Sequence, residues 1–148
     1  MKGMTPIVQN VTRLIIGFVI LFSVYVTVTG HLTPGGGFAG GVLFMVGIVL
    51  IVLAFGRSAT DELASEHVCH IMEGLGAFAF LAIALLGFGV VGAVFFTNFL
   101  PPGKVHDLFS GGTILLSNIA IGAKVAAGLT GIFLALVLSA RKAMYREF

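Results

Sequence analysis

Charged side chains are so sparse along this chain of 148 residues that long apolar stretches separate them. An α-helix needs about 20 mainly apolar residues to cross the hydrocarbon of a bilayer, so each long stretch is a candidate transmembrane helix. Four stretches qualify, at residues 11–30, 36–56, 71–96 and 113–139. The pattern therefore predicts an all-α integral membrane protein whose residues 1–148 form a single four-helix transmembrane domain.

Lysine and arginine residues gather on one side of this four-span arrangement. These residues are Lys2, Arg13, Arg57, Arg141, Lys142 and Arg146, and Lys104 falls on the other side. Cytoplasmic loops carry the excess of lysine and arginine, so both termini are expected in the cytoplasm. The first stretch is followed by another span and not by a signal-peptide cleavage site, so we expect it to remain a helix.

The two long connections differ in composition. The inner connection, residues 57–70, mixes acidic and basic side chains and is expected to form a short surface helix. The outer connection, residues 97–112, contains two prolines and three glycines. Because both residue types interrupt regular structure, this outer loop is expected to be irregular.

Composition excludes several classes of protein. Hydrophobic residues make up 58% of the chain and charged residues 9%, which is too apolar for a soluble domain of this size. Cys69 is the only cysteine, which excludes an internal disulfide and a cysteine zinc site. The net charge of +2 comes without a basic stripe, so nucleic acid is not an expected partner. No nucleophile-base pair, carboxylate pair or redox set of cysteines is evident, so neither catalysis nor a cofactor is expected.

A proline and six glycines interrupt the apolar pattern at residues 30–41, GHLTPGGGFAGG. Pro34 fixes its own backbone and favours an extended residue before it, which ends the first helix. Gly35 and Gly36 then allow a tight turn. A phosphate-binding loop is not expected here, because no preceding strand and no Gly-Lys-Ser/Thr sequence accompany the glycines.

The remaining glycines of this segment begin the second helix. Gly36 with Gly40, and Gly37 with Gly41, form two overlapping G-x-x-x-G pairs. This spacing removes side chains from one helix face and lets another helix approach closely. A helix of the same chain and a helix of a partner subunit fit the spacing equally well.

The order Gly30-His31, Pro34-Gly35-Gly36-Gly37-Phe38 and Gly40-Gly41 between the first two spans resembles the B subunit of Mrp-type multisubunit sodium/proton antiporters. That family also occurs in the antiporter-like module of membrane-bound hydrogenases and sulfur reductases. The resemblance extends over essentially the whole chain. It implies a non-catalytic subunit in the cell membrane of a prokaryote, with other antiporter-type subunits, lipid, Na⁺ and H⁺ as its partners.

Lys124 lies well inside the fourth span, where a charge is unfavourable unless it faces a polar interior. Helical periodicity places Ser117 and several small residues on its stripe, so Lys124 is expected to point at protein or water. Asn118 stands where antiporter members of the family often carry an acidic residue. Lys124, Ser117 and Asn118 are therefore candidates for an ion or proton path, and the alternative is a structural lysine paired with an acid of a neighbouring subunit.

Glu73 is expected one turn into the third helix, and His70 precedes it by one further turn. A carboxylate at this depth can hold a proton or a cation, so Glu73 and His70 are also candidates for the path. The alternative is that Glu73 only interacts with the positive end of the helix dipole. A metal site is not expected, because histidines at a membrane surface seldom bind metal without further ligands.

His31 lies on the opposite side of the membrane in this arrangement. It is expected to cap the first helix, because a histidine there interacts well with the free carbonyl groups. A cluster with His106 and Asp107 is the alternative, provided that the two outer loops meet.

Three classes of function remain open. The first is an antiporter subunit that contributes to the ion path and to subunit interfaces. Its complex is either a multisubunit antiporter or a hydrogenase or sulfur reductase that contains the same module. The second is a membrane scaffold without ion contact. The third is a small independent transporter that works as a homodimer.

Overall fold

The computed structural model describes residues 3–56, 66–91, 94–104 and 106–146. Most of them belong to four helices, α1 (Pro6–Val28), α2 (Gly37–Phe55), α4 (Glu66–Val91) and α5 (Thr113–Arg146). Each helix is long and apolar enough to cross a membrane, and the described ranges contain no strand. The all-α class with four helices of membrane-spanning length is confirmed.

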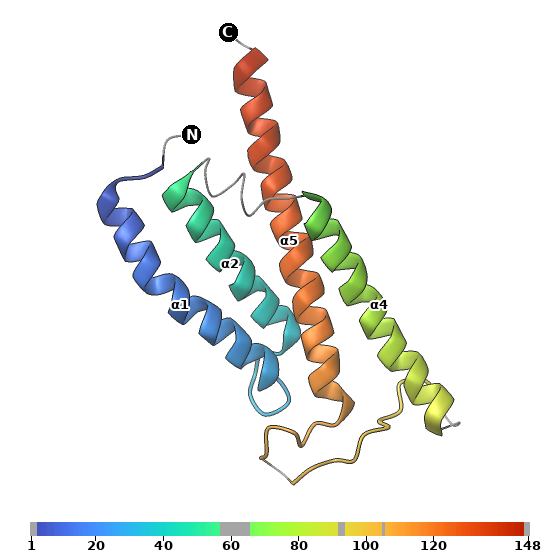
Figure 1. The fold of residues 1–148 in the computed structure, drawn as a ribbon. Helices are drawn as coiled ribbons and strands as arrows, with labels where there is room; N and C mark the ends of the chain where they lie inside the picture. The colour runs from blue at the N-terminus through green and yellow to red at the C-terminus, as the bar shows by residue number, and fades with distance from the viewer. Residues whose placement is uncertain (1–2, 57–65, 92–93, 105, 147–148) are drawn as a thin grey trace.

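The helices stand side by side in the spatial order α1, α2, α5, α4 (Figure 1). The last helix therefore lies between α2 and α4 and packs on both, while α1 packs mainly on α2. The start of α1 and the end of α5 lie at the same end of the molecule (Figure 1). With 34 residues, α5 is about 51 Å long and extends past the other helices at that end.

Helix α1 begins at Pro6, earlier than the expected span at residue 11. Proline suits the first position of a helix, because the N–H group that it lacks has no partner there. Arg13 lies inside α1, and its guanidinium carbon is 5.2 Å from the centre of the Phe55 ring. A charge at this place therefore ends the apolar span without ending the helix.

Helix α4 runs from Glu66 to Val91, whereas the expected span was 71–96. Residues 66–70 are thus the first turn of α4, and the rest of the expected surface helix lies outside the described residues. The earlier start places Glu73 about two turns and 10 Å into the helix. The field of a helix dipole is felt mainly within the first turn, so it does not account for Glu73.

The connection from α1 to α2 is closed by backbone hydrogen bonds around Thr29. Its N–H donates to the Tyr25 carbonyl at 2.9 Å, and its own carbonyl accepts from Leu32 at 2.8 Å. Gly35 and Gly36 follow with φ of 148° and 86°, and α2 begins at the next residue. These values lie where only glycine is unstrained, which explains why the turn uses glycine at both positions.

Gly40 allows α2 to lie directly against α1. The Ser23 hydroxyl donates a buried hydrogen bond of 2.8 Å to the Gly40 carbonyl. A Cβ atom at position 40 would collide with the Thr27 hydroxyl and lie 2.9 Å from the Ser23 carbonyl oxygen. The absence of a side chain therefore makes this hydrogen bond possible.

Gly37 and Gly41 face the opposite neighbour, α5. A Cβ atom at Gly37 would collide with the Asn118 carbonyl, and one at Gly41 would lie 2.7 Å from the Gly122 carbonyl oxygen. The small-residue pairs of α2 are thus occupied by two helices of the same chain. Their spacing in the sequence did not distinguish this from packing on a partner.

Candidate functional site

Glu73 of α4 and Lys124 of α5 face each other within the membrane-spanning helices. The Lys124 Nζ atom lies 3.8 Å from Glu73 Oε1. Lys124 is about 16 Å along α5 from its first residue, well inside a hydrocarbon layer of about 30 Å. The two residues are distant in the sequence and meet because α5 packs on α4. The acid that faces the lysine is therefore supplied by the chain itself.

A glycine on each helix makes room for this pair. A Cβ atom at Gly76 would lie 2.8 Å from the Lys124 backbone nitrogen, which shows how closely the helices approach. A Cβ atom at Gly128 would lie 3.3 Å from the Glu73 carboxyl carbon. Sequence reasoning missed Gly76, and it counted Gly128 only among the small residues on the Lys124 stripe. The positions of the two glycines, one turn after Glu73 and one turn after Lys124, were the available signal.

The pair is loose and partly open. A separation of 3.8 Å is beyond hydrogen-bond reach, so attraction between the charges holds the side chains together. The Lys124 side chain is 47% exposed and that of Glu73 is 40% exposed. Charges at this depth need polar surroundings, so this side of α4 and α5 requires water or a polar protein surface. A carboxylate in such a position can accept a proton or a cation in exchange for the ammonium group.

Two of the other path candidates, Ser117 and Asn118, make their contacts away from this pair. Ser117 is buried and donates to the Thr113 carbonyl of its own helix at 3.0 Å. Asn118 lies against the start of α2, next to Gly36 and Gly37, and its buried Nδ2 atom has no hydrogen-bond partner among the described residues. His70 is exposed near the start of α4, one turn before Glu73.

The loop after α1 and the loop before α5 meet at His31. Its Nε2 atom lies 3.5 Å from the backbone carbonyl oxygen of Asp107, and a Cβ atom at Gly111 would contact the imidazole ring. His106 is exposed and has a φ of 74°. The hydrogen bonds that close α1 come from Thr29, so the contacts of His31 join the loops instead of capping the helix.

Side chains that could bind a metal ion are dispersed. In the part of the chain that the structure describes, no three histidine, cysteine, aspartate or glutamate residues gather closely enough to hold a metal ion.

The chain matches a family model over residues 7–131, and that model describes a domain related to the MnhB subunit of Na⁺/H⁺ antiporters. It is 37% identical over 94 residues to the B subunit of the Na⁺/H⁺ antiporter of Bacillus subtilis, which covers 62% of this chain and 63% of that protein. It is 32% identical over 135 residues to an uncharacterized protein of Methanocaldococcus jannaschii, covering 85% of this chain and 50% of that protein.

Among solved structures, the fold is similar to a chain of the membrane-bound sulfane sulfur reductase, an archaeal respiratory membrane complex. The TM-score is 0.72 and the sequence identity 29%, over 87% of this chain and 56% of that chain. The chain therefore spans between half and two thirds of the length of these three relatives.

Proposed function

The chain belongs to the family of domains related to the MnhB subunit of Na⁺/H⁺ antiporters, and from this premise we propose that it is a non-catalytic subunit of a multisubunit monovalent cation/proton antiporter. Its partners in this proposal are other antiporter-type membrane subunits and the surrounding lipid. The complex lies in the cell membrane of a prokaryote, with both ends of this chain in the cytoplasm. The transported ions are Na⁺ and H⁺.

The observation that carries the proposal is the Glu73–Lys124 pair. Ionisable residues inside membrane spans are costly and usually serve transport, and this chain places two of opposite charge 3.8 Å apart. Both side chains are partly exposed, so a proton or cation can reach Glu73 from a partner subunit. Ser117 and Asn118 make their contacts elsewhere, and His70 lies one turn before Glu73, so we give these three candidates at most an accessory part in the path.

The order of events follows from the charges. While Glu73 is ionised, it attracts the Lys124 ammonium group. When a proton or Na⁺ occupies Glu73, this attraction disappears and Lys124 turns to another acceptor. Movement of the lysine then links occupation of Glu73 to the next site in a neighbouring subunit.

A second candidate is the same module within a redox-driven complex, such as a membrane-bound hydrogenase or a sulfane sulfur reductase. The TM-score of 0.72 to a chain of the sulfane sulfur reductase favours it. In that setting the redox chemistry belongs to partner subunits. Co-purification distinguishes the two candidates, because iron-sulfur or nickel proteins accompany the chain only in the second.

Substitution of the pair in the whole complex tests the ion path. Lys124→Met and Glu73→Gln remove a charge while keeping side-chain length, and Na⁺/H⁺ exchange is measured in everted membrane vesicles. We expect each variant to lose at least about tenfold in exchange rate, on the order of 1.4 kcal/mol, with the complex still assembled. Leu136→Met, at an exposed position of α5, is the matched control and keeps normal exchange.

Normal exchange in both charge variants would remove the ion path and leave the scaffold function. A second measurement tests the subunit role. Proteoliposomes that contain only this chain are expected to show no Na⁺/H⁺ exchange, whereas robust exchange would establish an independent transporter.

A further inference from the structure

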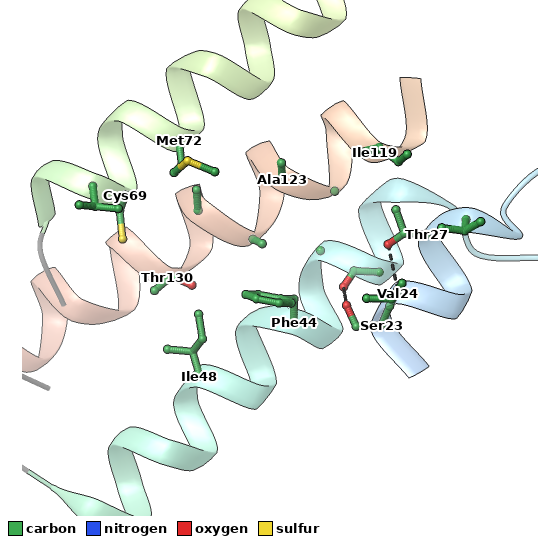
Figure 2. Close-up of a pocket in the computed structure, with 17 residues that line it drawn as sticks. Ser23, Val24, Thr27, Phe44, Ile48, Cys69, Met72, Ile119, Ala123 and Thr130 are labelled. Atoms are coloured by element: carbon green, nitrogen blue, oxygen red, sulfur yellow. Dashed lines mark hydrogen bonds between the residues drawn. The ribbon is translucent and has the colours of Figure 1, made fainter. Parts of the chain in front are cut away.

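The row of helices is hollowed on one face into a groove of about 570 Å³, to which all four helices contribute (Figure 2). We call it the four-helix groove. Representative lining residues are Val24 of α1, Phe44 of α2, Met72 of α4, and Ile119, Ala123 and Thr130 of α5. The lining is almost entirely apolar, and neither Glu73 nor Lys124 contributes to it. The groove is therefore a different place from the proposed ion path.

Small residues form its floor. Gly122, Ala126 and Thr130 follow one another at intervals of four along α5, and all three line the groove. Residues at this spacing stand above one another on the same side of a helix. Small side chains in that arrangement let a second helix approach closely, as in small-xxx-small contacts of membrane proteins.

Thr130, which also lines the groove, has a buried hydroxyl that lacks a hydrogen-bond partner among the described residues. The residue is only 3% exposed. Figure 2 shows Thr130 between Cys69 of α4 and Phe44 and Ile48 of α2. A buried hydroxyl without a partner is unfavourable, and an acyl chain offers no group that can satisfy it. A helix can do so with a polar side chain or with a carbonyl group.

The lengths of the relatives supply a source for such a helix. The chain covers 50% of the Methanocaldococcus jannaschii protein and 56% of the sulfane sulfur reductase chain. In both relatives this domain is thus joined to a comparable length of additional chain. In a complex in which this chain is one subunit, a separate subunit can supply the corresponding segment, and the groove is a hollowed, apolar face that can receive it.

We propose that the four-helix groove receives a transmembrane helix of a partner subunit, which packs on Gly122 and Ala126 and forms a hydrogen bond with Thr130. The inference rests on the proposed function only in that the chain works as a subunit. It identifies which face receives the partner and which chemistry the partner brings. That chemistry is an apolar helix with small residues at the contact and one hydrogen-bonding group.

Photocrosslinking in the assembled complex tests the occupant. p-Benzoylphenylalanine replaces Ile119, which lines the groove and is 47% exposed, or Ile132, which is 61% exposed on α5 and does not line it. We expect Ile119→p-benzoylphenylalanine to capture one defined membrane segment of a partner subunit, identified by mass spectrometry. The label at Ile132 is not expected to capture that segment. Capture of lipid alone, or of a second copy of this chain, at position 119 overturns the proposal.

Two substitutions inside the groove test the contact itself. Ala123→Leu fills the groove and is expected to abolish the crosslink from position 119, whereas Ala135→Leu, exposed elsewhere on α5, preserves it. Thr130→Val keeps the volume and removes the hydroxyl. We expect it to leave the isolated chain at least as stable as before, because it removes a buried hydroxyl without a partner, and to weaken retention of the partner about threefold, the size of an intramembrane hydrogen bond. Unchanged partner retention in both Ala123→Leu and Thr130→Val would contradict the proposal.

Exchange measurements keep this inference separate from the proposed function. If the crosslink persists in a complex that shows no Na⁺/H⁺ exchange, the proposed antiporter function is wrong and the proposed groove contact stands. If Na⁺/H⁺ exchange is normal and only lipid is captured at position 119, the proposed groove contact is wrong and the proposed antiporter function stands.

Discussion

A Cβ atom at Gly76 of α4 would lie 2.8 Å from the backbone nitrogen of Lys124 on α5. The two helices therefore approach closely beside the charged pair, and the pair depends on a residue that carries no charge. A side chain at position 76 would separate the helices and with them Glu73 and Lys124.

We predict that Gly76→Ala destabilises the folded chain by about 1–3 kcal/mol, because the added methyl group meets backbone atoms that cannot rotate away. Gly74→Ala is the matched control, since nothing lies within 4 Å of a Cβ atom there. It is expected to stabilise α4 by up to about 1 kcal/mol through helix propensity. The thermal midpoints of the two variants in detergent check the difference, and equal midpoints would contradict the close approach.

A second prediction concerns the contact between α1 and α2. Gly40→Ala places a methyl group against the Thr27 hydroxyl and the Ser23 carbonyl, so it is expected to lower the thermal midpoint clearly. Gly17→Ala on α1 meets nothing within 4 Å and should leave the midpoint unchanged or raise it. An unchanged thermal midpoint in Gly40→Ala would show that α1 and α2 can move apart without loss of stability.

The buried hydrogen bond between Ser23 and Gly40 gives a third prediction. Ser23→Ala removes a 2.8 Å bond from a buried hydroxyl and is expected to destabilise the chain by about 0.6 kcal/mol, and at most about 1.7. Ser139 also bonds a backbone carbonyl, at 2.9 Å, but is exposed. Ser139→Ala should therefore change stability by less than about 0.5 kcal/mol. Equilibrium unfolding of both variants in mixed micelles measures the two values.

Exchange of the two charges gives a fourth prediction. Glu73→Lys or Lys124→Glu alone places like charges at the site and should reduce the amount of folded subunit in the membrane. The double variant restores opposite charges and should recover part of that loss. Because the pair is partly exposed, we expect an interaction free energy of about 0.5–1 kcal/mol. Strictly additive effects in this double-mutant cycle would mean that the two side chains do not interact.

The four helices could be predicted from the sequence, because the apolar stretches between charges are long enough to cross a membrane and a single stretch can do so only as a helix. The helix ends follow less well. Arg13 lies inside α1, and α4 begins at Glu66, before the apolar stretch, because a hydrogen-bonded helical backbone continues past the charges that bound an apolar span. The tight turn at Gly35 and Gly36 was predicted from residues whose conformational limits are local.

The pairing of Glu73 with Lys124 could not be derived from the sequence. Each residue was identified by its depth, but which helix lies next to which is decided by packing over the whole row. Periodicity also grouped Ser117 with Lys124, whereas the Ser117 hydroxyl bonds within its own helix. The four-helix groove was missed for the same reason, because its lining comes from all four helices.

The position of α5 between α2 and α4 has a consequence for synthesis. The ribosome completes α4 before it reaches Lys124, so Glu73 enters the membrane or its insertion channel without its counter-charge. At about 5–20 residues per second, the roughly 50 residues between them take on the order of 3–10 s. During that interval the charge of Glu73 disfavours insertion of α4, and the arrival of the last helix with Lys124 reduces this cost.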